Sequence, residues 1–445
     1  MQPQLALLLG TALVCWLLYR DMRWRRLPSP ALWIAGLWLL FASSRQVSFW
    51  LNFGRSGESS SLEGSPINLV FNSALILAAI LVLRQRGFSW GKFSSANKAL
   101  VAIFAFFLCS MLWSPFPVPT LKRVIQNFGC VLSGLIILTE KDPAASLRVV
   151  FARVSYVLFP LSVVFIRYFP HIGRVVSLVS GTHMLSGVTG HKNALGEMTM
   201  VFCLVLLWDL METRKHETAP KAKPKHWTRL ISLGIGLYLL VISDSATGLL
   251  CFLLGVVLLY IGKRLARMKN ARQVIMVGAL AMACLLAFEQ VFGMSGGVFK
   301  ALDSDTTLTG RTDIWRVTLE KNTAHLLGNG LGAFWETSEG ESVWREIGMN
   351  RLVTAHNGYL ETYLNGGLVG LFLLGAMIWS TGLNAMNKLV KRDPIGRLAL
   401  LFWFIILINN VTESVFFFPG PLWLTMLLVT IDSQWQNGPV EGGHP

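Results

Sequence analysis

Charged residues are scarce in this chain. Asp, Glu, Lys and Arg make up 14% of its 445 residues, whereas hydrophobic residues make up 53%, and the mean hydropathy is +0.53. A soluble chain of this length would carry far more charge. The composition therefore argues against a soluble protein. It predicts an all-α polytopic membrane protein, because apolar runs long enough to cross a bilayer recur along the sequence.

Acidic residues are scarcer than basic ones. Asp and Glu number 24 against 39 for Lys and Arg, which gives a net charge of +15. In a membrane protein the excess of Lys and Arg gathers mostly on cytoplasmic connections, which lie against the membrane lipids. The positive charge therefore does not require a nucleic-acid partner, and we expect none.

Cysteine patterns and regular repeats are lacking. The six cysteines all fall inside apolar runs, without a Cys-x-x-Cys pair or a Cys/His cluster, which argues against a disulfide framework or a zinc site. No repeat of fixed period and no low-complexity tract is present. Residues 1–4 carry no positive charge, and Arg23 and Arg25 follow the first apolar run. We therefore expect no cleavable signal peptide.

The apolar runs predict a bundle of about 12–13 transmembrane helices. Their approximate bounds are 4–19, 31–50, 67–83, 98–113, 120–138, 149–167, 194–211, 229–242, 246–262, 274–292, 367–383, 396–411 and 418–432. We divide the chain into an N-terminal transmembrane bundle (1–292), a long outside loop (293–365), and C-terminal transmembrane helices with a short tail (366–445).

The basic connections predict the orientation. Connections rich in Lys and Arg are residues 20–26, 84–92, 214–229, 263–272 and 388–397. Along the chain these basic connections alternate with the less basic ones, so all of them can lie on the cytoplasmic side. The amino terminus then lies outside and the carboxyl terminus inside. The outside connections are residues 52–66, 114–120, 169–192, 243–245, 293–365 and 412–421.

At its length of roughly seventy residues, we expect the long outside loop to be folded. We predict a helix from Asp313 to about Leu327, with Thr312 as its cap, and a tight glycine-rich turn at residues 328–332. That turn lacks the Lys-Ser/Thr pair of a nucleotide-binding loop.

The loop ends in Ala-His-Asn-Gly-Tyr-Leu at residues 355–360. On a predicted helix, His356 and Tyr359 share one face, and Asn357 and Glu361 lie on the neighbouring one. A titratable imidazole then lies at the membrane boundary. It is either a structural histidine of an interfacial helix or a catalytic group.

Several basic residues lie on the side that basic residues should avoid. They map to the outer face or just beneath it, and are Arg45, Lys122, Arg123, Arg167, Arg174, Lys192 and Arg311. For any one of them, snorkelling to a lipid headgroup is a sufficient explanation. As a set on one face they favour an anionic ligand, because guanidinium groups bind phosphate or pyrophosphate bidentately.

The sequence Asp303-Ser304-Asp305 matches the Asp-x-Asp metal motif of nucleotide-sugar enzymes. Nucleotide sugars are not expected outside the cytoplasm, so we interpret these residues as a solvated loop. We expect no metal and no cofactor.

The polar motifs, taken in order, resemble the O-antigen ligase and polymerase superfamily of bacterial envelope glycosyltransferases. The resemblance covers about residues 40–430 and is most specific from Gly310 to Gly370. The motifs that carry it are residues 190–196, 243–248, 310–315, 328–332, 356–360 and 366–370. The Gly-His-Lys-Asn stretch at 190–193 and Ser-Arg-Gln-Val-Ser-Phe-Trp-Leu at 44–51 are more similar to the exopolysaccharide-production branch.

This resemblance implies an enzyme of the bacterial inner membrane whose active site faces the periplasm. The donor would be a glycan on undecaprenyl pyrophosphate, and the acceptor a sugar, including the lipid A-core of lipopolysaccharide. The resemblance also implies inversion at the anomeric carbon without a metal. The family's functional histidine and arginine carry over to His356 and Arg311, and an upstream arginine to Arg123.

We assign roles on this basis. His356 would accept the acceptor's proton, with Glu361 as the alternative base. Arg311 and Arg123 would stabilise the leaving pyrophosphate. Asn357 and Tyr359 would orient substrate, and His191 would either cap a helix or take part in chemistry. The remaining predicted binding residues are Arg45, Arg174, Lys192 and Ser245.

Two other classes of protein remain open. A transporter or flippase of lipid-linked glycans would also carry cationic residues, but it should show broken helices and paired repeats. A non-catalytic partner of an envelope polysaccharide assembly complex is the third possibility. Within the enzyme class, ligase and polymerase differ only in the acceptor, which the sequence does not reveal.

Overall fold

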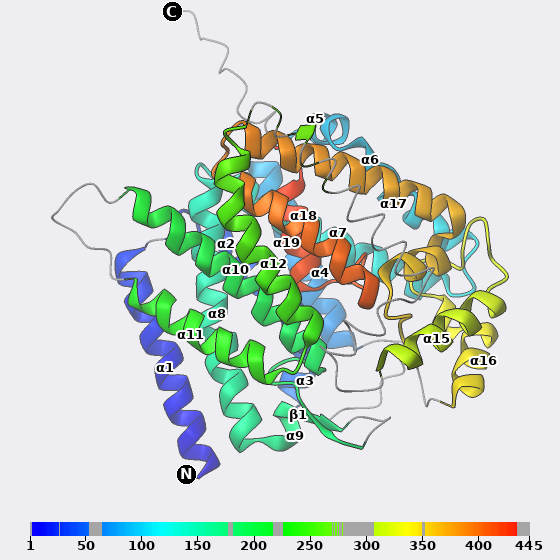
Figure 1. The fold of residues 1–445 in the computed structure, drawn as a ribbon, viewed down its shortest axis with the longest axis horizontal. Helices are drawn as coiled ribbons and strands as arrows, with labels where there is room; N and C mark the ends of the chain where they lie inside the picture. The colour runs from blue at the N-terminus through cyan, green and yellow to red at the C-terminus, as the bar shows by residue number, and fades with distance from the viewer. Residues whose placement is uncertain are drawn as a thin grey trace, which may run out of the picture.

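The computed structural model describes residues 2–25, 27–52, 65–176, 181–216, 226–268, 307–348 and 352–433, with a few positions between 270 and 278. Helices dominate these residues, and the only sheet among them is a two-stranded hairpin (Figure 1). The elements are α1 (Pro3–Trp24), α2 (Leu32–Ala42), α3 (Val47–Leu51), α4 (Pro66–Gln85), α5 (Trp90–Ala96), α6 (Lys98–Cys109), η1 (Ser110–Leu112), α7 (Pro117–Leu138), α8 (Pro143–Tyr168), α9 (Pro170–Gly173), β1 (Arg174–Val176), β2 (His183–Leu185), α10 (Lys192–His216), α11 (Trp227–Ile242), α12 (Ala246–Leu265), α15 (Thr307–Lys321), η3 (Phe334–Glu336), α16 (Ser338–Ile347), α17 (Gly358–Val390), α18 (Gly396–Thr412) and α19 (Pro421–Thr430).

The helices confirm an all-α polytopic membrane protein. Among the described residues, seven helices are long and apolar enough to cross a membrane, and the bent pair α5–α6 makes an eighth candidate. Four shorter apolar helices, α2, α11, α18 and α19, complete the bundle. Twelve of the predicted spans coincide with these elements. The thirteenth, residues 274–292, lies outside the described residues except for positions 275 and 278.

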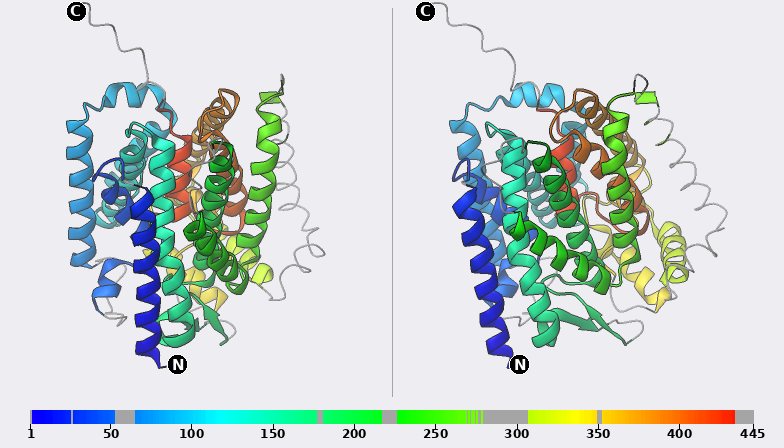
Figure 2. Two further views of the ribbon diagram at one scale, coloured as in Figure 1. Left: turned by 90° about the vertical axis from the view of Figure 1, so that its left-hand side faces the viewer. Right: turned by 60° about the vertical axis from the view of Figure 1, so that its left-hand side comes forward.

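The bundle has an inner and an outer set of helices. Most residues of α7, α8 and α10 are buried, whereas α1, α4 and α12 are mainly exposed along the outside. Proline at the first position of α4, α7, α8 and α19 starts these helices, since its missing N–H is not needed there. Figure 2 shows α5 at one end of the bundle, and the N-terminus and the β1–β2 hairpin at the other.

The long loop is folded beside the bundle. α15 packs on α16 around a small apolar core of Ile314, Val317, Phe334, Trp335, Val343, Leu352, Ala355 and Leu364. Because Leu364 belongs to α17, this core joins the loop to the membrane helices (Figure 1).

α15 differs from its prediction. It begins at Thr307 and ends at Lys321, so Thr312 lies inside the helix and does not cap it. A glycine inside a helix costs only about 1 kcal/mol, and Gly310 therefore does not prevent the earlier start. Residues 325–327 form a turn instead of continuing the helix to Leu327.

The first turns of α17 are interrupted at Gly367, where φ is +61° and ψ is −157°. Residues 325–330 pair with this interruption. The backbone N–H groups of Leu368 and Val369 donate to the carbonyls of His325 and Leu326, and Gly330 N–H donates to the Asn365 carbonyl. The glycine-rich turn therefore fills the break in the helix and satisfies its backbone groups.

Candidate functional site

Glu413, directly after α18, is the centre of a polar cluster. One carboxylate oxygen accepts a hydrogen bond from Asn193 Nδ2 at 2.6 Å and forms an ion pair with Arg311 Nη2 at 3.2 Å. The other oxygen lies 3.4 Å from His356 Nδ1. We call these four residues the Glu413 cluster. Its members come from the start of α10, from α15, from the end of the long loop and from the α18–α19 connection. All four positions lie in or directly beside connections that were predicted to be outside.

Backbone hydrogen bonds hold His356 against Glu413. Gly358 N–H donates to the Glu413 carbonyl at 3.0 Å, and Asn357 N–H donates to Ser414 Oγ at 3.1 Å. A side chain at position 358 would collide with Asn410, whose amide oxygen accepts from the backbone at residues 415 and 416. Glycine at 358 therefore permits the close approach of the two segments.

His356 lies outside the helix, contrary to the predicted shared face. α17 starts at Gly358 because the Asn357 side chain caps it, accepting from the N–H groups of Tyr359 and Leu360. His356 has a left-handed backbone with φ of +50°, a conformation that is uncommon for residues other than glycine and is often found at functional sites. Its side chain is 34% exposed.

The arrangement of His356 suits proton transfer. A neutral imidazole that donates its Nδ1 hydrogen to Glu413 keeps Nε2 unprotonated, so Nε2 can accept a proton. The carboxylate both selects this tautomer and stabilises the imidazolium that forms.

The electrostatics keep Glu413 ionised. Burial alone would raise the pKa of its carboxyl, but the hydrogen bond and charge of His356 and the charge of Arg311 outweigh burial and hold the pKa below its ordinary value of 4.5. Burial lowers the pKa of the neighbouring His191 below 6.5, although Glu413 opposes this. His191 is thus neutral at pH 7. Its Nδ1 accepts from Asn193 N–H at the start of α10, which is a capping contact.

A second cluster surrounds Arg123 of α7. Its guanidinium donates to the Gly332 carbonyl and lies 4.0 Å from Glu336, so it contacts the glycine-rich turn. Glu361 is buried beside it and accepts hydrogen bonds from Trp335 Nε1 and from Ala355 N–H, at 3.1 Å and 2.9 Å. Since Ala355 precedes His356, Glu361 supports the backbone of that segment. Both of its oxygens face donors, which leaves it less free than His356 to act as a base.

The other predicted binding residues have local contacts. Arg45 stacks on Phe49 and donates to the Thr189 carbonyl, next to the His191 segment. Lys192 pairs with Asp244 at 3.3 Å. The remaining three make contacts typical of structural residues: Arg174 with the Ile166 carbonyl, Ser245 as the cap of α12, and Tyr359 with the Leu407 carbonyl.

Metal ligands do not gather in the described part of the chain, where no three His, Cys, Asp or Glu side chains could hold an ion together. Asp303 and Asp305 lie outside the described residues. Metal independence therefore stays a prediction.

Glu413 and Asn193 were not among the predicted site residues. A signal for Glu413 was present, because it is the sole carboxylate of the short connection 412–421 and follows the polar pair Asn409 and Asn410 at the end of an apolar run. Basic residues on the outer side predicted the site, and Glu413 carries the opposite charge.

The fold and the site define a multi-pass membrane protein with a partly exposed histidine–arginine–carboxylate centre beside a folded loop. A model of the O-antigen ligase family matches residues 231–375, which include Arg311 and His356. The chain is also similar to the exopolysaccharide production protein ExoQ of Rhizobium meliloti (strain 1021). The two are 28% identical over 319 residues, which cover 67% of this chain and 68% of the relative. Both findings support the resemblance of this chain to the O-antigen ligase and polymerase superfamily.

Proposed function

We propose that this protein transfers a glycan from undecaprenyl pyrophosphate to a hydroxyl of an acceptor sugar on the periplasmic face of the bacterial inner membrane. The observation that carries this proposal is the Glu413 cluster, in which His356 and Arg311 share one carboxylate while His356 stays partly exposed. Base and cation are thereby held side by side. ExoQ, by its name, acts in exopolysaccharide production, and that supports a polysaccharide substrate.

In the proposed reaction the acceptor oxygen attacks the anomeric carbon of the donor. A carbon–oxygen bond forms there, and the bond from that carbon to the pyrophosphate oxygen breaks on the opposite face, which inverts the configuration. The acceptor proton passes to His356 Nε2. The departing pyrophosphate carries its negative charge away, stabilised by Arg311, with Arg123 at the neighbouring turn.

A transporter or flippase is the second candidate, because α17 is broken at Gly367 and the α5–α6 pair is bent by 103°. Broken helices in transporters expose backbone groups to substrate and ions. At Gly367 those groups are instead paired with residues 325–330. This favours the enzyme over the transporter, and the partly exposed His356 beside Arg311 favours the enzyme over a non-catalytic assembly partner.

The decisive experiment incubates the purified protein with a lipid-linked repeat unit, with and without acceptors, and identifies products by mass spectrometry. We expect release of undecaprenyl pyrophosphate and a new glycosidic product. Longer glycans on the carrier without an added acceptor would identify a polymerase, and glycan on lipid A-core a ligase. Donor binding without transfer would contradict the proposal.

The proposed orientation has its own test. Single cysteines replace Ser338 in α16 and Ala222 in the basic connection, in a cysteine-free background. In intact spheroplasts an impermeant thiol reagent should label position 338 and leave position 222 unmodified. Labelling of position 222 alone would reverse the orientation and place the Glu413 cluster in the cytoplasm.

A further inference from the structure

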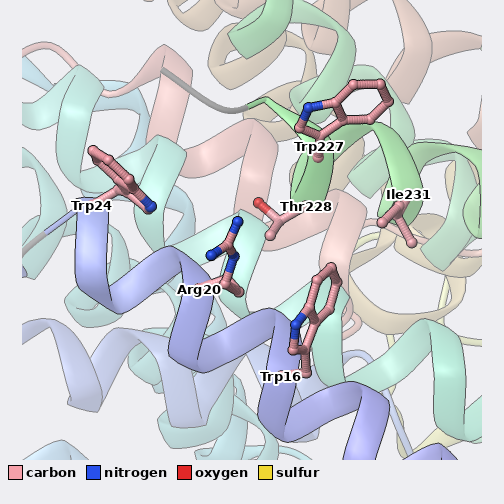
Figure 3. A pocket seen from close by; sticks show the side chains of 6 residues that line it. All are labelled: Trp16, Arg20, Trp24, Trp227, Thr228 and Ile231. Atoms are coloured by element: carbon pink, nitrogen blue, oxygen red, sulfur yellow. The ribbon is translucent and has the colours of Figure 1, made fainter. Parts of the chain in front are cut away.

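A cavity of about 240 Å³ opens between α1 and α11 (Figure 3). It is lined by Trp16, Arg20, Trp24, Trp227, Thr228 and Ile231. The three tryptophans are 44%, 59% and 66% exposed, so they form an open rim. On α1 the residues Trp16, Arg20 and Trp24 are four apart and therefore follow one face of the helix.

Arg20 differs from the other arginines nearby. Arg25, Arg148 and Arg229 pair with Asp209, and Arg153 pairs with Asp21. Within the described residues, no carboxylate lies within 4.0 Å of the Arg20 guanidinium. Its positive charge faces the cavity, where a ligand could approach it between the indole rings (Figure 3).

The cavity lies at the end of the bundle away from the Glu413 cluster. Asp209, which pairs with Arg25 just after α1, is on the same continuous helix as Asn193. Sixteen residues separate them, roughly 24 Å at 1.5 Å per residue. The cavity thus adjoins the connections 20–26 and 214–229, which the excess of basic residues assigns to the inner leaflet.

We propose that this cavity binds the headgroup of an anionic phospholipid of the inner leaflet. The guanidinium of Arg20 would hold the phosphate, with Thr228 at the cavity wall, and the tryptophan rings would lie at headgroup level, where indoles prefer to be. The apolar side of Ile231 and Trp16 would contact the acyl chain. We favour ligand binding over snorkelling as the role of Arg20, because its side chain lines a cavity between two helices.

Native mass spectrometry of the detergent-purified protein tests the proposal, with phosphatidylglycerol and phosphatidylcholine titrated separately. Arg20→Gln should weaken phosphatidylglycerol binding about fivefold, the usual share of one basic residue at an anionic surface. It should leave phosphatidylcholine binding unchanged. Arg23→Gln is the matched control, because Arg23 is exposed on α1 and does not line the cavity.

Equal phosphatidylglycerol binding by Arg20→Gln and the parent would overturn the proposal, as would an equal loss in Arg23→Gln. Trp227→Ala should also weaken binding by removing one wall, without changing the charge. Melting temperatures of all three variants show whether they are folded, and no change in them is expected, since among the described residues Arg20 forms no ion pair.

Discussion

Two carboxylates organise the charges of this protein in different ways: Asp209 lies on α10, and Glu413 contacts Asn193 at the start of the same helix. Asp209 pairs with Arg25, Arg148 and Arg229, and its side chain is only 1% exposed. Glu413 faces Arg311 and His356, and its side chain is 18% exposed. Both clusters join several helices. We call the first the closed cluster, because its carboxylate is almost wholly buried. We call the second the open cluster, because the side chain of His356 is 34% exposed.

The difference in exposure separates charged residues that stabilise the fold from charged residues that can take part in a reaction. A buried carboxylate that pairs with three arginines forms an ion-pair network, and this network links α1, α8, α10 and α11. A carboxylate that shares its oxygens between arginine and a half-exposed imidazole holds a base in place.

Loss of the imidazole should have the largest effect. His356→Ala should lower turnover roughly 10²–10⁴-fold, the usual share of a general base, while donor binding persists through the arginines. His356→Asn tolerates the left-handed backbone and can donate to Glu413, but it cannot act as a base, so it should be equally impaired. Turnover and donor binding are measured on purified protein.

The matched control for His356 is His325→Ala. His325 is an exposed histidine of the same loop, and its side chain hydrogen-bonds to Tyr363, so its loss should leave turnover near normal. A folded His356→Asn protein with normal turnover would remove His356 from the mechanism and make Glu361 the candidate base.

Neutralising the closed cluster should damage folding instead of chemistry. Asp209→Asn leaves its arginine partners without their carboxylate, which should destabilise the protein by about 3–5 kcal/mol and lower the melting temperature. Asp244→Asn is the control, because Asp244 is 84% exposed and pairs only at the surface. If Asp209→Asn melted like the parent but lost turnover, the assignment of the two clusters would be wrong.

Replacing Arg311 separates its charge from its shape. Arg311→Ala should cost roughly 2–4 kcal/mol of transition-state stabilisation. Arg311→Lys keeps the charge but loses the planar fork, and should fall between Ala and the parent. Arg316→Ala on the same helix is the control, since Arg316 is 59% exposed. kcat/KM is the readout, and an Ala variant with parental kcat/KM would assign Arg311 to lipid contact.

Lowering the pH should reduce the stability of the folded protein by a small amount, through the Glu413 cluster and the neighbouring His191. The folded pKa values of His191 and Glu413 both lie below their ordinary values of 6.5 and 4.5, so the unfolded chain binds protons first as the pH falls. The contribution of His191 to the free energy of unfolding is therefore lost as the pH falls from 6.5 through the pKa of His191 in the folded protein. The contribution of Glu413 is lost in the same way as the pH falls from 4.5. Melting temperatures measured against pH should fall below pH 4.5 in the parent, and this fall should disappear in Glu413→Gln.

The same Glu413→Gln variant should lower turnover by roughly 10- to 100-fold, by analogy with carboxylates that orient metal-bound histidines. A variant that kept both the acid limb and full turnover would show that Glu413 neither titrates in this range nor positions His356.

The sequence predicted the fold well because transmembrane helices are local features. Each described span could be found from an apolar run in its own stretch of chain. The orientation, which the distribution of basic residues predicts, stays a prediction. The gathering of His356 and Arg311 followed from a family resemblance. Both kinds of inference depend on residues near each other in sequence or in a recognised order.

The parts that could not be predicted depend on distant residues. Glu413 meets Asn193 across 220 positions of sequence, and no local pattern encodes that contact. The left-handed conformation of His356 arises from the cap at Asn357 and the pairing with residues 413–414. The break at Gly367 has a glycine as its only local signal, whereas the turn that fills it lies some forty residues earlier.

The chain order of the Glu413 cluster has a consequence for biosynthesis. A ribosome delivers Asn193 first, then Arg311, then His356, and Glu413 only when α18 has been made. Until that moment the nascent chain holds its histidine and arginines without the carboxylate that orients them. Activity would thus be acquired in one step near the end of synthesis, and a chain truncated before residue 413 would insert most of its helices yet remain inert.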